Sequence, residues 1–163
     1  GVELEGKKDI GKSLEFRGNV TLVRSESQFV RKDFSIVDGK KFYLPIDTIY
    51  RPMFGQAPFL VNAMLSYKAD SLGLTATLSY NVQGERLVIT GAFKGWADVY
   101  ELPRHLVDFK VSKKIGEHFT ASLTVRDILN APVLRAYDLP TGWFDFDRFR
   151  YGTTYLLSVG YKL

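Results

Sequence analysis

The stretch LTATLSYNV (residues 74–82) alternates between apolar and small polar residues at every position. Successive side chains of a β-strand point to opposite faces, so this stretch predicts a strand with one apolar and one polar face. Six further segments show the same alternation, namely residues 2–10, 16–22, 61–68, 107–112, 119–126 and 154–163. The sequence therefore predicts an all-β, antiparallel protein of about seven strands, and no segment shows a clear helical period.

The connections between these segments are alternately short and long. Short ones lie near residues 11–13, 69–73 and 116–118, and long ones span about residues 27–57, 90–104 and 130–151. This pattern is typical of a transmembrane β-barrel with short periplasmic turns, long extracellular loops and strands of about ten residues. A soluble β-sandwich also has strands with one apolar face, so the strand alternation by itself leaves that alternative open.

Composition narrows the class of protein further. The chain is 45% hydrophobic and 14% aromatic, so it has enough apolar side chains to fold. It has no cysteine, which excludes a disulfide scaffold, a thiol enzyme and cysteine-ligated metal centres. No stretch approaches the roughly 18 continuous apolar residues of a membrane-spanning helix. A formal net charge of +4, carried by scattered residues, gives no reason to expect a nucleic-acid partner.

In a membrane barrel, the apolar faces of the predicted strands would meet lipid and the polar faces would line the lumen. Aromatic residues lie near predicted strand ends, where the aromatic girdles of such barrels are found. Tyr67, Phe119 and Tyr161 lie beside short turns or the C-terminal end. The residues that we predict to face lipid are Val61, Ala63, Leu65, Tyr67, Leu74, Ala76, Leu78, Tyr80, Val107, Phe109, Val111, Leu157, Val159 and Tyr161.

The long connections hold the candidate contacts for an extracellular ligand or partner, because binding residues concentrate on loops held by a rigid scaffold. Two of these connections mix aromatic and charged residues, which suits an amphipathic ligand or a partner that acts as a lid. The candidates are Phe93, Lys94, Trp96, Tyr100, Trp143, Phe144, Phe146 and Arg148. The alternative is that these rings only pack the loops together or belong to an outer girdle.

No catalytic or metal-binding pattern is evident, so we expect neither an enzyme nor a cofactor. His105 and His118 would lie one membrane span apart, on the order of 25 Å, and could not share a metal. Asp145 and Asp147 lack the glycine-centred ligand pattern of a calcium loop. No serine lies in a G-x-S-x-G motif.

Four segments resemble motifs in the late strands of TonB-dependent outer-membrane receptors. Residues 55–63, GQAPFLVNA, resemble the start of a strand of the form GQAP(Y/F)-x-x-N, and residues 100–108, YELPRHLVD, resemble a segment with an E-x-P-R motif. Residues 125–132, VRDILNAP, resemble a strand end, and residues 151–163 resemble the closing strand, which in the family commonly ends in Phe rather than Leu. The chain thus resembles the C-terminal barrel portion of a Bacteroidota-like receptor.

The resemblance implies an integral protein of the Gram-negative outer membrane that binds a ligand and imports it with TonB-coupled energy. Such transporters have about 22 strands around a plugged lumen, so residues 1–163 would form only the C-terminal part of the barrel, without the plug domain. The implied partners are outer-membrane lipid, the rest of the barrel and plug in the same protein or another chain, TonB through the missing N-terminal part, and a surface lipoprotein.

Strand number gives an independent reason to expect an incomplete barrel. An odd number of antiparallel strands leaves the two chain ends on opposite sides, and an open sheet in lipid has two unpaired edges. We therefore expect other strands to complete the barrel. Two other functions stay open: a small structural or adhesive outer-membrane barrel would need an eighth strand, and an outer-membrane enzyme would need an acid, a base and a nucleophile near one rim.

Overall fold

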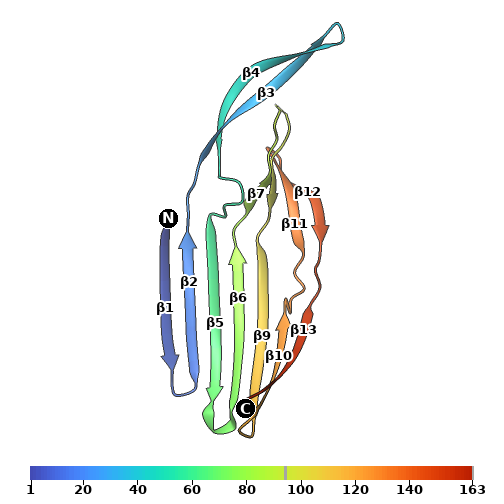
Figure 1. The fold of residues 1–163 in the computed structure, drawn as a ribbon. Coiled ribbons are helices and arrows are strands. Elements are labelled where there is room, and N and C mark those ends of the chain that lie inside the picture. The colour runs from blue at the N-terminus through green and yellow to red at the C-terminus, as the bar shows by residue number, and fades with distance from the viewer. Residues whose placement is uncertain (94, 163) are drawn as a thin grey trace.

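The computed structural model describes residues 1–93 and 95–162, apart from the side chains of residues 31–32 and 45–47. This part of the chain is all-β and antiparallel, and it forms three sheets (Figure 1). The largest, here called the main sheet, has seven strands in the order β1-β2-β5-β6-β9-β10-β13. These strands are β1 Val2–Ile10, β2 Leu14–Leu22, β5 Phe59–Ala69, β6 Leu74–Gln83, β9 Arg104–Ile115, β10 Phe119–Arg126 and β13 Thr154–Tyr161.

The seven segments predicted from alternation correspond to the seven strands of the main sheet. The short connections join β1 to β2, β5 to β6 and β9 to β10 at the same end of the sheet (Figure 1). Each contains a glycine with a positive φ, namely 69° at Gly11, 57° at Gly73 and 62° at Gly116. Glycine adopts this conformation without the steric cost that other residues incur, so it permits these tight turns. The β5–β6 connection also holds the 3-10 helix η1, Asp70–Leu72.

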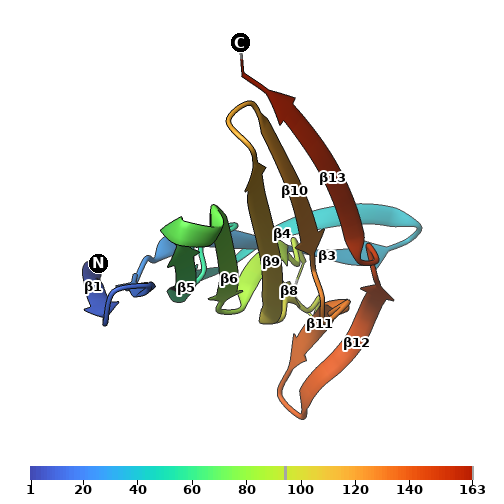
Figure 2. The ribbon, with the colours of Figure 1, turned by 90° about the horizontal axis from the view of Figure 1, so that it is seen from below.

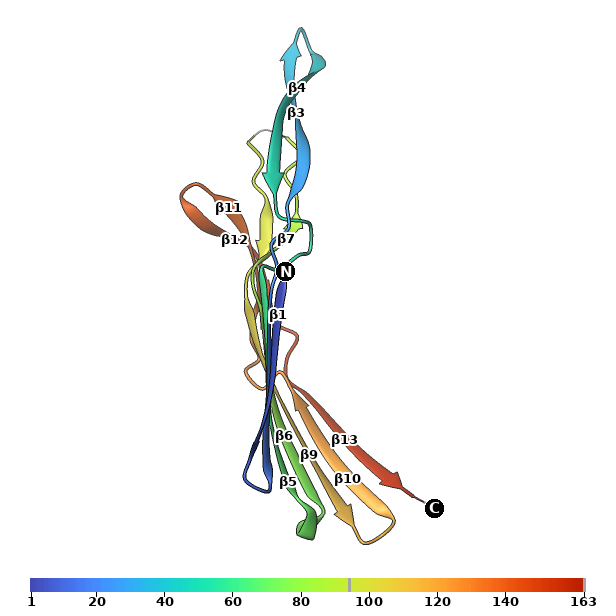
Figure 3. The same cartoon turned by 90° about the vertical axis from the view of Figure 1, so that its left-hand side faces the viewer.

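The main sheet is open, as expected from its odd number of strands. β1 and β13 are its edge strands, and they run in the same direction because every neighbouring pair is antiparallel. Seen from below and from the side, the sheet is a single twisted layer in which β10 and β13 turn away from the plane of β1 (Figures 2 and 3). The predicted all-β, antiparallel architecture is therefore confirmed, with a largest sheet of seven strands that is not closed into a barrel.

Strand register places the apolar residues on one face of the main sheet. In one row across the sheet, Leu65 pairs with Leu78, Leu78 with Phe109, and Phe109 with Val125. All the residues predicted to face lipid lie on this face, because each occupies an alternate position in the same register. The face is exposed, with 44% of Leu78 and 74% of Leu157 accessible to solvent. We call it the apolar face.

The predicted long loops are largely β-structure, which the sequence interpretation missed. The first holds a hairpin of β3, Ser27–Val37, and β4, Lys40–Arg51, which projects beyond the main sheet (Figure 1). Segments of the other two form a four-stranded sheet, here called the small sheet, in the order β12-β11-β8-β7. Its strands are β7 Arg86–Ile89, β8 Val99–Glu101, β11 Val133–Leu139 and β12 Gly142–Phe149.

Bulges explain why these strands were not predicted. The register shifts once in the β3–β4 pair, once in the β11–β12 pair and once in the β7–β8 pair. An extra residue at each shift breaks the two-residue period by which strands are recognised in a sequence. No shift of this kind occurs in the main sheet.

Most buried apolar side chains of the described chain lie in or beside the small sheet. They include Val82 at the end of β6, followed by Leu87, Val99, Tyr100, Val133 and Ala136. The main sheet, by contrast, has little core of its own. Within the described residues, no helix is both long enough and apolar enough to cross a membrane.

Candidate functional site

The motif segments around Arg104 and Asp127 meet where the main sheet passes into the small sheet. Arg104, at the start of β9, forms an ion pair with Asp127, which directly follows β10, and both side chains are largely buried. The Asp127 N–H donates to Asp108 Oδ1 over 2.9 Å, and its carboxylate accepts the N–H of Ala131 over 3.1 Å. The Arg104 Nε also donates to the carbonyl of Ala131 over 3.0 Å. These bonds fix the turn that leads from β10 to β11.

A row of charged side chains crosses the small sheet. Glu101 on β8 pairs with Arg86 on β7 over 2.7 Å and with Arg135 on β11 over 3.5 Å. Arg135 in turn lies 3.8 Å from Asp147 on β12. Opposite charges on directly paired strand positions attract each other, so this row stabilises the strand pairing. Glu101 and Arg104 of the E-x-P-R motif therefore both have structural partners.

A second buried ion pair joins the β3–β4 hairpin to the small sheet. Arg51, the last residue of β4, pairs with Asp98, whose carboxylate also accepts the N–H of Gly91 over 2.7 Å. A Cβ at Gly91 would lie 2.2 Å from the carbonyl oxygen of Trp96, so no other residue fits without a shift of the backbone. These contacts shape residues 90–93 and 95–98, the described part of the segment here called the 90–98 loop. No sequence pattern indicates the Arg51–Asp98 pair, whose members lie 47 residues apart.

The 90–98 loop and the β11–β12 hairpin line a pocket of about 620 Å³. Four rings line it, from Trp96 in the loop, Tyr137 on β11, and Phe144 and Phe146 on β12. The rings of Tyr137 and Phe146 meet edge to face, with centroids 5.3 Å apart. Three of the residues predicted from the sequence thus line one pocket, here called the aromatic pocket.

The other predicted contacts lie elsewhere. Phe93 packs edge to face on Trp96, with centroids 5.1 Å apart, and is not among the residues that line the pocket. Tyr100 and Trp143 form a similar pair, with centroids 5.6 Å apart. Tyr100 faces away from the pocket, because it alternates along β8 with Val99, a pocket residue. Burial raises the pKa of the Tyr100 hydroxyl above its ordinary value.

The two remaining candidates do not contribute a described contact to the pocket. Arg148 is exposed on β12 and pairs in register with Leu134. Lys94 lies outside the residues that the structure describes. Of the eight residues predicted to contact a ligand or partner, three line the aromatic pocket and the other described ones do not. The prediction therefore identified only part of this site.

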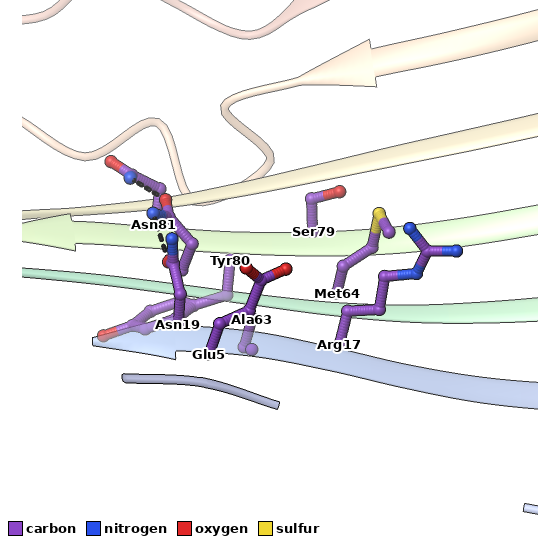
Figure 4. A pocket seen from close by; sticks show the side chains of 10 residues that line it. Glu5, Arg17, Asn19, Ala63, Met64, Ser79, Tyr80 and Asn81 are labelled. Carbon is purple, nitrogen blue, oxygen red and sulfur yellow. Dashed lines mark hydrogen bonds between the residues drawn. The ribbon is translucent and has the colours of Figure 1, made fainter. Parts of the chain in front are cut away.

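The polar face of the main sheet has a row of asparagines that the sequence interpretation did not single out. Asn62 donates to Asn19 Oδ1 over 2.7 Å, and Asn81 donates to Asn62 Oδ1, so one row links β2, β5 and β6 (Figure 4). A shallow cavity of about 340 Å³ lies along it, and the side chains of Arg17 and Met64 lie on the same side of the sheet (Figure 4). The signal available in the sequence was the recurrence of asparagine at polar positions of three strands.

The two histidines lie at opposite ends of the main sheet, as expected. His105, near the start of β9, has its Nδ1 2.7 Å from the hydroxyl of Tyr80. His118, in the β9–β10 turn, has its Nδ1 3.1 Å from the carbonyl oxygen of Lys162. In the part of the chain that the structure describes, no three acidic or histidine side chains are grouped so that they could hold a metal ion.

Comparison with known proteins adds no relative from which a function could be carried over. A scan against protein-family models, a search of curated proteins and a search of solved structures each found no match to this chain. The likeness to TonB-dependent receptors therefore rests on the four sequence segments alone.

Proposed function

We propose that this chain is part of the wall of a TonB-dependent outer-membrane receptor, which binds a ligand outside the cell and imports it. The observation that carries the proposal is the apolar face, which runs from β2 to β13 and is mostly exposed or half-exposed, with Lys8 at the β1 edge and Lys113 near the turn end of β9 as its charged residues. In water, an exposed patch of this size would be an aggregation surface. Lipid is the environment in which such a face is stable, as on the outside of a barrel.

The opposite face supports the same proposal because it has the polarity of a lumen wall. Besides the asparagine row, Ser122 pairs with Ser112 and with Ser158 across three neighbouring strands. The hydroxyls of Ser66 and Thr77 lie 3.3 Å apart on β5 and β6. Small polar side chains on alternate positions are what a water-filled or plugged lumen requires.

The size and the two ends of the main sheet also support the proposal. Its strands have 8 to 12 residues, and a tilted strand needs about 9–11 residues to cross a membrane. Tight glycine-containing turns lie at one end, and the hairpin and small sheet lie at the other. In a receptor, the first end would be periplasmic and the second extracellular, where a surface lipoprotein would bind.

The open edges require further strands. Unpaired backbone groups along β1 and β13 would each cost several kcal/mol in lipid. Because β1 and β13 run in the same direction, antiparallel closure requires an odd number of additional strands between them. The rest of the receptor would supply these strands together with the plug and the segment that contacts TonB.

The absence of cysteine allows a direct test of this orientation. Lys40→Cys places a thiol at the tip of the β3–β4 hairpin, and Lys12→Cys places one in the β1–β2 turn. In intact cells that express the protein, we expect a membrane-impermeant maleimide to label position 40. We expect it to label position 12 only after the outer membrane is permeabilised. Equal labelling of the two thiols in intact cells would overturn the proposal.

A further inference from the structure

We propose that the aromatic pocket binds an uncharged small molecule that carries at least one apolar ring. This inference rests on the proposed function and deepens it, since it gives the chemical class of the ligand on the extracellular side. The pocket has a volume of about 620 Å³, which lies within the range of about 300–1,000 Å³ typical of small-molecule sites.

The floor of the pocket is one apolar row across the whole small sheet. Ile89 pairs with Val99, Val99 with Tyr137, and Tyr137 with Phe144, so four adjacent strands each contribute one side chain. Val99 is only 1% exposed, whereas Phe144 at the edge of the row is 66% exposed. The exposed rings of Phe144 and Trp96 offer faces against which a planar ligand ring can stack.

The β-bulge in β12 adds a second ring to this floor. The register shift opposite Arg135 and Ala136 leaves Phe146 as the extra residue between Asp145 and Asp147. Bulges are known to redirect side chains in this way. Here the ring of Phe146 meets that of Tyr137, and both line the pocket.

The charges around the pocket argue for an uncharged ligand. No charged side chain lines the pocket in the described part of the chain. Among the described charged groups near the pocket, Asp98 pairs with Arg51, and Arg135 pairs with Glu101. Asp138 and Asp145 occupy strand positions that alternate with the lining residues Tyr137 and Phe144, which places them on the other face of the small sheet. A charged ligand would therefore lose its hydration without gaining an opposite charge. The polar side-chain groups that remain for hydrogen bonding are the hydroxyls of Thr90 and Tyr137 and the indole N–H of Trp96.

The pocket is held in shape by contacts within its lining and beside it. Gly91 allows the close approach of the Trp96 carbonyl, and the Asp98 carboxylate binds the Gly91 N–H. Arg51 anchors Asp98 from the base of the β3–β4 hairpin, with its guanidinium 4.1 Å from the centroid of the Phe29 ring. Such prior ordering lowers the entropic cost of binding a ligand.

The chain has two tryptophans, which gives the test a matched control. Trp143→Phe leaves Trp96, in the pocket, as the only tryptophan of residues 1–163, and Trp96→Phe leaves Trp143. The experiment titrates each variant in detergent micelles, in the protein that includes the strands completing the barrel, with a bromonaphthalenemethanol and with the corresponding bromonaphthoate. Any tryptophan in those further strands contributes equally to both variants, so the difference between the variants reports on Trp96 and Trp143. Bromine quenches indole fluorescence on contact, and partition of either probe into micelles affects both variants alike.

We expect the neutral alcohol to quench Trp96 saturably, with an affinity about tenfold higher than that of the carboxylate. Trp143 should show no saturable quenching, and Phe144→Ala in the Trp143→Phe background should weaken binding of the alcohol by about tenfold. The inference is overturned if the alcohol does not bind saturably, if the carboxylate binds as tightly, or if Trp143 is quenched equally. Each of these results is independent of the labelling at positions 12 and 40, so it would leave the proposed receptor function standing.

Discussion

The main sheet and the small sheet are both antiparallel, but the small sheet buries its apolar side chains whereas the main sheet exposes many of them. The small sheet buries side chains such as Leu87 and Val99 and pairs its charges in a row through Glu101. The main sheet has regular register, an exposed apolar face and few buried residues. The small sheet thus provides much of its own stability, whereas the main sheet depends on a medium that covers its apolar face.

The largest effect is expected where the two sheets meet. Arg104→Gln leaves the carboxylate of Asp127 buried without its cation, and we expect a loss of about 3–5 kcal/mol in the free energy of unfolding. Denaturant titration of the protein folded in lipid vesicles measures this loss. Arg17→Gln breaks an ion pair on the exposed surface of β2 and is the control, with little measurable change expected. Similar losses in the two variants would show that the junction is not a special source of stability.

An arginine introduced on one or the other face of β6 shows how the surroundings of the apolar face differ from those of the polar face. Leu78→Arg places a cation in the middle of the apolar face, and we expect it to cost about 2–4 kcal/mol in vesicles, because lipid cannot solvate the charge. Ser79→Arg is the matched variant on the polar face and should cost much less. The same vesicle titration measures both. Equal costs would mean that the two faces meet the same medium.

Beside the small sheet, adding one methyl group at Gly91 tests whether the 90–98 loop depends on the close contact between Gly91 and the Trp96 carbonyl. Gly91→Ala would force a Cβ against the Trp96 carbonyl, and we expect destabilisation on the order of 2 kcal/mol together with a change in Trp96 emission. Gly6→Ala on β1 is the control, since a Cβ there meets no atom within 4 Å. If Gly91→Ala left both stability and emission unchanged, the Trp96 carbonyl could not lie as close to Gly91 as it does in the structure.

The smallest of these effects concerns the polar face. Asn62→Ala removes the middle of the asparagine row and should cost about 1 kcal/mol for each hydrogen bond lost. Ser79→Ala, on the same face and outside the row, serves as the comparison. Vesicle titration of the two variants should separate them. An Asn62 variant as stable as the Ser79 variant would show that the row adds nothing to the pairing of the strands.

The sequence predicted the main sheet well because its strands have no bulges. The alternation of residues 74–82 identifies both the strand and its apolar face, and the register of β5, β6 and β9 agrees with it. In the small sheet, the extra residues Val88 in β7 and Phe146 in β12 break that period, so these strands escaped prediction. A pattern within one short segment does not indicate strand pairings that depend on tertiary packing.

The aromatic pocket was only partly predictable for the same reason. The aromatic composition of the loops identified Trp96, Phe144 and Phe146. It also selected Trp143, which pairs with Tyr100 away from the pocket. Tyr137 was missed because its segment does not alternate regularly. The Arg51–Asp98 pair depends on where the hairpin base packs, which no short segment encodes.

The most direct test of the account measures what each face of the main sheet contacts. Spin labels attached to Leu78→Cys and Ser79→Cys, in the protein reconstituted into lipid, are compared for collision with oxygen, which concentrates in lipid, and with a water-soluble nickel chelate. We predict that the label at position 78 collides mainly with oxygen and the label at position 79 mainly with the nickel chelate. Strong collision of the nickel chelate with the label at position 78 would contradict the claim that the apolar face lies in lipid.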